Sequence, residues 1–336
     1  MDTLLVILGP TGVGKTELSL RLAEHYGCPI VSADSRQIYS ELPIGTAAPT
    51  AEEQQRVTHY FIGTKRLAEE YNAGQYERDC LQLLDQLRRQ TALPNTPFAL
   101  LTGGSMMYID AVCKGLDDIP NVPSAVRNKV TEDYRTNGLE WLQREVERLD
   151  PCYWAEVDKQ NPQRLMHCVE ICLTTGKPYS VFRRRTHGGE GAERNFRIVK
   201  IGLRRPKEEL YERINRRVEA MMGQGLEEEA YRAYESLPTD DNGQKKVPNS
   251  LNTVGYKELF RYFEGEWTKE YAMAMIQQNT RHYAKRQMTW FRRDKDIDWL
   301  EINDDYEKQI LENQIKFVRI IRKWIKSRYK YYLQFT

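Results

Sequence analysis

Residues 9–16 read Gly9-Pro10-Thr11-Gly12-Val13-Gly14-Lys15-Thr16 and fit the pattern G-x-x-x-x-G-K-[ST]. The short apolar run Thr3–Leu8 precedes them, and Gly14–Tyr26 follows as a predicted helix whose apolar positions are Leu18, Leu20, Leu22 and Ala23. A buried strand, a glycine-rich turn and a helix in this order predict a phosphate-binding loop. The glycines let successive backbone N–H groups turn toward one anion, and the helix N-terminus adds partial positive charge.

Two side chains of this loop have predicted roles. Lys15 is expected to reach the outer phosphates of a diphosphate or triphosphate, and the Thr16 hydroxyl suits a Mg²⁺ ligand. The loop does not identify the reaction, because NTP hydrolysis and phosphoryl transfer both use it. We find no persuasive apolar strand that ends in the metal-holding Asp of motor and switch NTPases, which argues against that class.

Apolar runs alternate with periodic segments along the first third of the chain. We expect strands at Ile30–Ser32 and Phe98–Leu101 and helices at Tyr76–Arg89 and Met106–Cys113. Each strand ends in a glycine or polar loop, so the pattern predicts an α/β fold: a P-loop NTPase-like parallel sheet with helices on both faces. After Pro206 the pattern is mainly helical to the end of the chain.

The middle of the chain has a different texture. Residues 124 to about 175 are helical in pattern without a convincing strand, and strand character returns at Phe196–Leu203. We therefore expect residues 1–117 and 196–336 to form the α/β core with a helical C-terminal part. Residues 118–195 should form an all-helical or mainly helical insertion domain.

Composition excludes several classes of protein. Of the 336 residues, 40% are hydrophobic, which is too many for a disordered protein. The formal net charge is +2, and a net charge this small does not by itself predict nucleic-acid binding. Its six cysteines include no C-x-x-C pair, and Cys168 and Cys172, beside His167, are better explained as buried small side chains than as a metal site. The longest early apolar run, Leu4–Leu8, is too short for a signal or membrane segment, so we expect a cytoplasmic protein with free thiols.

A second candidate loop follows the predicted strand Ile30–Ser32. It reads ADSRQIY at residues 33–39 and continues with IGTAAPT at residues 44–50. Asp34 would lie at the carboxyl end of a core strand, where doubly wound folds bind ligands. From its position alone, Asp34 could be a general base, a metal ligand or a helix cap.

Together with the phosphate loop, these segments resemble the bacterial tRNA dimethylallyltransferases, also called tRNA isopentenyltransferases. The resemblance continues, in the family's order, through TGGSMMY (102–108), NPQRL (161–165), TGKP (175–178), RINRRV (213–218), VGYKE (254–258) and RHYAKRQMTWF (281–291). It extends from residue 4 to about residue 300. Several ordered motifs are more specific than one phosphate loop.

The resemblance implies transfer of a dimethylallyl group from dimethylallyl diphosphate to the exocyclic N6 amine of adenosine 37 in tRNA, with release of diphosphate. Asp34 would accept the amine proton, and Ser105 and Arg127 would support the flipped base. The phosphate loop, Gly9 to Thr16, would hold the diphosphate rather than ATP, with Mg²⁺ at Thr16 and Arg217 as a clamp. Arg217 and Arg127 could each instead be solvated helix charges.

The expected partner is the anticodon stem-loop of tRNA, contacted by the insertion domain, and the expected state is a monomer. The residues implied in tRNA binding are Asp34, Ser35, Arg36, Gln37, Gln163, Arg164, Leu165, Gly255, Tyr256, Lys257, Arg281, Lys285 and Arg286. Three departures from the family bear on such contacts: Ser105 replaces the usual Thr, Ala48 the usual Lys, and Tyr60 the second His of a pair.

Basic residues are unevenly placed on this near-neutral chain. Residues 281–293 carry five Lys or Arg and no acid, interleaved with aromatic rings that include Trp290 and Phe291, and residues 316–330 carry seven. Arg183-Arg184-Arg185 forms a third group. Cations and flat rings suit phosphates and unstacked bases, although the rings could be core residues and the charges a solvated face.

Two other functions remain open from the residues alone. A P-loop small-molecule kinase that uses ATP would share the phosphate loop, Mg²⁺ and Asp34, but would not need the basic aromatic segments. A non-catalytic RNA-binding protein gated by a nucleotide would need those basic aromatic segments but would not need a general base.

Overall fold

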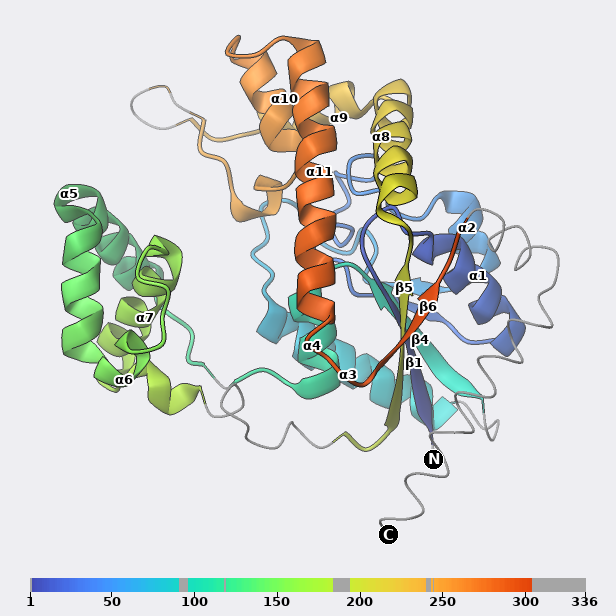
Figure 1. Ribbon diagram of the computed structural model, residues 1–336, viewed down its shortest axis with the longest axis horizontal. Helices are drawn as coiled ribbons and strands as arrows, with labels where there is room; N and C mark the ends of the chain where they lie inside the picture. Colours follow the sequence, from blue (N-terminus) through green and yellow to red (C-terminus); the bar gives the residue numbers. More distant parts are fainter. Residues whose placement is uncertain are drawn as a thin grey trace. The chain divides into compact units, whose positions relative to one another are not determined.

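The strand β1 (Thr3–Leu8) forms because six consecutive residues can all be buried between the layers of a parallel sheet. The structure, a computed structural model, describes residues 2–90, 96–117, 119–183, 194–239, 243 and 245–303. Its sheet has the order β3-β2-β4-β1-β5-β6, and all five strand pairings are parallel (Figure 1). The other strands are β2 (Ile30–Ser32), β3 (His59–Tyr60), β4 (Pro97–Gly103), β5 (Arg197–Arg204) and β6 (Ile297–Glu301).

The helices of the α/β part are α1 (Lys15–Tyr26), α2 (Ala51–Arg56), α3 (Ala73–Gln90), α4 (Met106–Lys114), α8 (Lys207–Gly223), α9 (Leu226–Glu235), α10 (Tyr256–Phe263) and α11 (Lys269–Phe291), with a 3₁₀ turn at Asn249–Leu251. The predicted α/β class is confirmed. The part of the chain after Pro206 that the structure describes is mainly helical, as expected, but it also contains β6, which the sequence pattern did not predict and which pairs with β5 at the sheet edge. Its sequence, IDWLE, lacks the continuous apolar run by which the central strands were found.

Alternate residues of β1 supply the two faces of the sheet. Leu5 and Ile7 pack with α1 and α8 in one buried cluster, whereas Leu4, Val6 and Leu8 pack with α3 and α4 in another. Figure 1 shows α1 on one side of the strands and α3 with α4 on the other. Because β1 is buried on both faces, the loop that follows it starts from a rigid point at the carboxyl edge of the sheet.

The chain divides into two compact units. One consists of residues 1–113 and 194–336, and the other of residues 114–193, so the boundaries fall within a few residues of the predicted 118 and 195. The second unit contains α5 (Ser124–Leu149), broken at Gly138, α6 (Pro151–Trp154), α7 (Pro162–Thr175) and a 3₁₀ turn at Tyr179–Phe182. No strand is assigned in the described part of this unit, which agrees with its helical sequence pattern.

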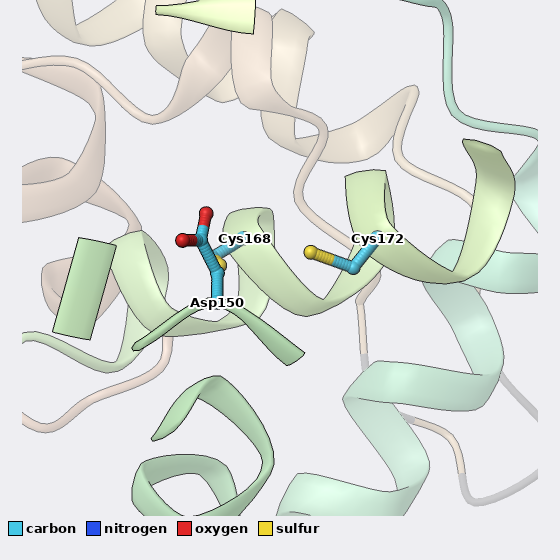
Figure 2. Close-up of side chains that lie close together, drawn as sticks. All are labelled: Asp150, Cys168 and Cys172. Atoms are coloured by element: carbon cyan, nitrogen blue, oxygen red, sulfur yellow. The ribbon is translucent and has the colours of Figure 1, made fainter. Parts of the chain in front are cut away.

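Cys168 and Cys172 lie beside Asp150 in the core of this helical unit (Figure 2). Both thiols are buried, as predicted. The Asp150 carboxylate already accepts hydrogen bonds from Tyr153 N (3.0 Å), Ser180 N (2.6 Å) and Ser180 Oγ (2.8 Å). Because these bonds occupy both carboxylate oxygens, the cluster is explained by capping and packing.

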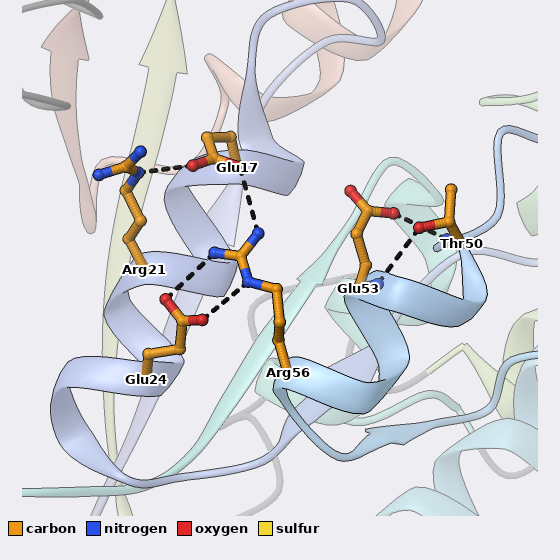
Figure 3. Close-up of polar contacts among 6 residues, drawn as sticks. All are labelled: Glu17, Arg21, Glu24, Thr50, Glu53 and Arg56. Carbon is orange, nitrogen blue, oxygen red and sulfur yellow. Dashed lines mark hydrogen bonds and ion pairs between the residues drawn. The ribbon is translucent and has the colours of Figure 1, made fainter.

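Helix α2 is attached to α1 by charged groups (Figure 3). Arg56 donates two hydrogen bonds to Glu24, at 2.8 and 3.2 Å. Thr50 and Glu53 form a capping box at the start of α2. This capping box fixes the residue at which the loop of residues 44–50 ends and the helix begins. Within the described residues, no helix is both long and apolar enough to cross a membrane.

Candidate active site

The phosphate loop lies between β1 and α1, where the sequence predicts it. Three of its residues, Gly9, Gly12 and Gly14, have a positive φ that favours glycine: Gly9 has φ 147°, and a Cβ there would lie 2.6 Å from the carbonyl oxygen of Leu203. Gly12 has φ 79°. The Lys15 ammonium donates hydrogen bonds to the carbonyls of Gly9 and Pro10, both at 2.9 Å. Burial is the main cause that lowers the pKa of Lys15 to about 7; Arg217 lowers it further and Asp34 opposes the shift.

Three arginines in or just before α8 hold this loop from the side. Arg205 Nε donates to the Val13 carbonyl at 3.0 Å, and Arg213 Nε donates to the Gly12 carbonyl at 3.1 Å. Arg217 donates to the Thr11 hydroxyl at 3.2 Å. Arg217 is partly buried and bonded to the loop, which favours a role at the phosphate loop over a solvated helix charge, and burial lowers the pKa of its guanidinium. Its exposed neighbour Arg216, by contrast, pairs with Glu212.

Asp34 follows β2, the strand next but one to β1. Its Oδ1 accepts hydrogen bonds from the backbone N–H groups of Arg36 (2.9 Å) and Gln37 (3.3 Å), which fixes the turn. The turn after β4 lies against it: Ser105 Oγ accepts from Ser35 N at 2.8 Å and donates to Ser35 Oγ at 3.1 Å. The structure therefore brings Asp34 and Ser105 together, as the order of the strands requires.

A cavity of about 280 Å³ opens between these loops. One part of its wall is polar and includes Thr11, Asp34, Ser105 and Arg217. The other part is apolar and comes from α8, α9 and α11; it consists of Ile214, Val218, Met221, Leu226 and Ile276. Cations and a carboxylate beside an apolar wall can accommodate a molecule with an anionic end and a hydrocarbon end.

Six of the residues implied in tRNA binding line this cavity: Asp34, Ser35, Arg36, Gly255, Lys257 and Arg286. Lys257 and Arg286 are exposed at its rim. The Gln37 amide is used inside the protein, since it accepts from Ser32 and donates to the carbonyls of Thr46 and Ala47.

Arg281 and Lys285 lie on α11 but do not line the cavity. Arg281 donates to Asn215 Oδ1 at 2.6 Å on α8, and Lys285 is exposed. Trp290 and Phe291 are packing residues, since Phe291 is buried and Trp290 donates to Asp110 at 2.7 Å. The basic residues 316–330 and Arg184-Arg185 lie outside the described residues.

Two of the proposed tRNA contacts require correction. Leu165 is fully buried in the core of the helical unit, and Tyr256 is fully buried beneath α9. Neither side chain is available to a ligand in this structure, so both are packing residues. Gln163, Arg164 and Arg127 are exposed on α7 and α5.

Two residues near the site, Glu229 and Gln287, escaped the sequence reasoning, and a third, Tyr283, was noted only as one of the aromatic rings among the basic residues 281–293. Glu229 is the last of three consecutive glutamates, and the sequence does not show that this one differs from the other two. Tyr283 and Gln287 lie inside the segment RHYAKRQMTWF. Tyr283 lines the cavity, and its hydroxyl donates to the Gly104 carbonyl at 3.3 Å. Burial raises the pKa of Tyr283 to about 12, and the charge of Asp34 adds to the shift. The spacing 276, 280, 283, 287 on α11 could have indicated one helix face turned toward a site.

Comparisons with known proteins point to one family. A family model described as IPP transferase matches residues 37–294. The tRNA dimethylallyltransferase 1 of Phocaeicola vulgatus is 53% identical over 311 residues, which cover 93% of this chain and 97% of the relative. The crystal structure of a full-length tRNA isopentenylpyrophosphate transferase from Bacillus halodurans has a TM-score of 0.65 and 30% identity, and covers 98% of this chain and 99% of that one. A eukaryotic dimethylallyltransferase acting on tRNA, 21% identical with a TM-score of 0.76 over 97% of this chain and 80% of that one, shares the fold.

Proposed function

The chain belongs to the IPP transferase family, the tRNA dimethylallyltransferases, and we propose that the cavity beside its phosphate loop is where the prenyl group is transferred. The enzyme is a prenyltransferase with dimethylallyl diphosphate and tRNA as substrates. The ATP-dependent kinase and the non-catalytic RNA-binding protein are not favoured. The acceptor we propose is the N6 amine of adenosine 37 in the anticodon stem-loop, with the protein acting as a monomer.

The phosphate loop is the binding site for the diphosphate of the donor. Loop N–H groups, the Lys15 ammonium and the Arg217 guanidinium supply positive charge, and the apolar wall of Ile214, Val218 and Met221 suits a five-carbon tail. As the bond between C1 and oxygen breaks, its electron pair goes to the diphosphate. The same positive groups stabilise that growing charge.

The residues present also fit Mg²⁺. Thr16 is exposed at the first turn of α1, directly after Lys15, so its hydroxyl is accessible. Mg²⁺ retains several waters and commonly uses few protein ligands together with phosphate oxygens. Thr16 would hold the ion with the diphosphate, and the ion would supply neutralising charge there.

Asp34 is the proposed general base. The exocyclic amine of adenine is a poor nucleophile, because its lone pair is delocalised into the ring. The amine nitrogen forms a bond to C1 of the donor while its proton passes to the Asp34 carboxylate. Ser105 positions this loop through Ser35.

The observation that carries the proposal is that Asp34 and Arg217 line one cavity with an apolar wall between helices. A base for an amine, a cation for a diphosphate and space for a hydrocarbon are the three elements that prenyl transfer to an amine requires. A kinase would not need the apolar wall.

Asp34→Asn tests the assignment of the base. The Asn carbonyl can still accept from the N–H groups of Arg36 and Gln37, so the turn should remain while the base is lost. We expect single-turnover transfer from labelled dimethylallyl diphosphate to unmodified tRNA to fall by about 10²–10⁴-fold. Asp296→Asn, at an exposed carboxylate, is the matched control. Nearly intact transfer by Asp34→Asn would disprove the role, and ATP consumption without prenyl transfer by the wild-type enzyme would favour a kinase.

A further inference from the structure

Gln287 joins two of the loops that form the cavity. It lies on α11 and is fully buried. Its Oε1 accepts a hydrogen bond from the backbone N–H of Thr11 at 2.9 Å, and its Nε2 donates to the carbonyl of Gly104 at 2.8 Å. One side-chain amide thus connects the phosphate loop after β1 with the turn after β4.

The turn is shaped around this side chain. A Cβ at Gly104 would lie 2.5 Å from Gln287 Nε2, so Gly104 leaves room that the amide fills. The same hypothetical Cβ would lie 4.0 Å from Asp34 Oδ2, which shows how close the proposed base is to this contact. Tyr283, one turn earlier on α11, donates to the same carbonyl.

Both ends of the amide lead directly to groups that would contact the substrates. On one side, the Thr11 hydroxyl accepts from Arg217, the proposed diphosphate clamp. On the other side, Gly104 precedes Ser105, which accepts from Ser35 next to Asp34. Gln287 is therefore the link between the donor side and the base side of the cavity.

We propose that Gln287 is a positioning residue that sets the spacing between the donor diphosphate and the proposed base, Asp34. This inference rests on the proposed function. The reacting nitrogen and C1 must approach to within about 3–3.5 Å, and a small misplacement costs about 10²-fold in rate. Gln287 touches neither reacting atom, so its effect should be on the transfer step and not on binding of each substrate alone.

Gln287→Glu is the most informative variant. A carboxylate can accept from Thr11 N–H but cannot donate to the Gly104 carbonyl, whereas a protonated carboxyl group can do both. Burial raises the pKa of a carboxyl group, so protonation should occur in mildly acidic solution. We expect single-turnover transfer at pH 8 to be about 10²-fold slower than wild type, and the ratio of variant to wild-type rate to rise as the pH is lowered to 6.

Gln278→Glu is the matched control. It is the same substitution on the same helix at an exposed position, and its rate should equal the wild-type rate at both pH values. KM for each substrate and the affinity for inorganic pyrophosphate should stay within about threefold of wild type in the neutral variant Gln287→Asn, which adds no charge beside the phosphate loop.

Gln287→Asn provides a second variant if Gln287→Glu fails to fold. Its side chain is one methylene shorter and cannot span both loops, and we expect a similar loss of transfer without recovery in acid. A wild-type rate for Gln287→Glu at pH 8, a loss in Gln287→Glu that acid does not relieve, or a loss of pyrophosphate affinity in Gln287→Asn equal to its loss of transfer rate would each overturn the inference. A wild-type enzyme inert toward both substrates would instead refute the proposed function.

Discussion

The hydroxyl of Tyr256 donates a hydrogen bond of 2.6 Å to the buried carboxylate of Glu229. The same carboxylate accepts from the backbone N–H groups of Ile44 and Gly45, both at 2.8 Å. Gly45 lines the cavity, so this contact holds one wall of the active site on α9 and α10. Tyr256 matters because it supports the site, not because it touches tRNA.

Loss of the Glu229 carboxylate should therefore destabilise the protein. Glu229→Ala leaves one buried donor, the Tyr256 hydroxyl, and the partly buried N–H groups of Ile44 and Gly45 without an acceptor, and we expect the free energy of unfolding to fall by about 3 kcal/mol. Tyr256→Phe removes one donor and should cost about 1 kcal/mol. Urea unfolding of both variants measures the difference. Equal stability of Glu229→Ala and wild type would show that the loop is held by other contacts.

Removal of the Lys15 ammonium should weaken donor binding. Lys15→Met keeps the length of the side chain, and loss of a charge-assisted contact of about 2 kcal/mol predicts about thirtyfold weaker binding of inorganic pyrophosphate. Calorimetric titration measures the affinity, with exposed Lys295→Met as the control. Because burial lowers the pKa of Lys15 and disfavours its charge, the unliganded fold should tolerate the change. Unchanged affinity would place the diphosphate elsewhere.

The ion pair of Arg56 with Glu24 should contribute to stability in a pH-dependent way. The hydrogen bond from Arg56 is the main cause that lowers the pKa of Glu24 below its usual value. A carboxyl group whose pKa is lower in the folded state stabilises the fold above its unfolded pKa, and this contribution is lost as the pH falls through the folded value. Arg56→Ala should cost less than about 1 kcal/mol at pH 7, because both groups are partly exposed, and close to nothing at pH 3.

Chemical denaturation across this pH range measures the effect. Arg135→Ala, which breaks a more exposed pair with Glu132, is the control and should have no measurable effect. A cost of Arg56→Ala that grows as the pH falls would contradict the sign.

Arg286 should bind tRNA through a phosphate. It is exposed at the rim of the cavity and stacks on Tyr283 at 5.7 Å. We expect Arg286→Ala to weaken tRNA binding and to reduce the slope of log affinity against log salt concentration by about 1. Filter binding at several salt concentrations measures both quantities. Arg261→Ala is the control, because Arg261 lies over Trp267 away from the cavity lining. An unchanged slope for Arg286→Ala would rule out the phosphate contact.

The sequence predicted most of the sheet and the place of the site. The apolar runs at β1, β2 and β4 identified three adjacent strands, and parallel strands bring their carboxyl ends to one edge. That geometry is why Lys15, Asp34 and Ser105 could be expected close together. Edge strand β6 was missed because its sequence, IDWLE, is short and interrupted by acidic residues, and β3 because it has only two residues.

What the sequence alone determined was local: the phosphate loop depends on glycines and a strand–turn–helix order within a few residues, and the family motifs preserve that order. Tertiary structure alone decided which polar side chains are buried and what they contact. Nothing in the local sequence separates Glu229 and Gln287 from exposed polar residues. Glu229 bonds to Tyr256, 27 residues away, and Gln287 bonds to Thr11, 276 residues away. A buried polar group is defined by the distant backbone groups that satisfy it, and only the packing of α9 and α11 against the loops brings those groups together.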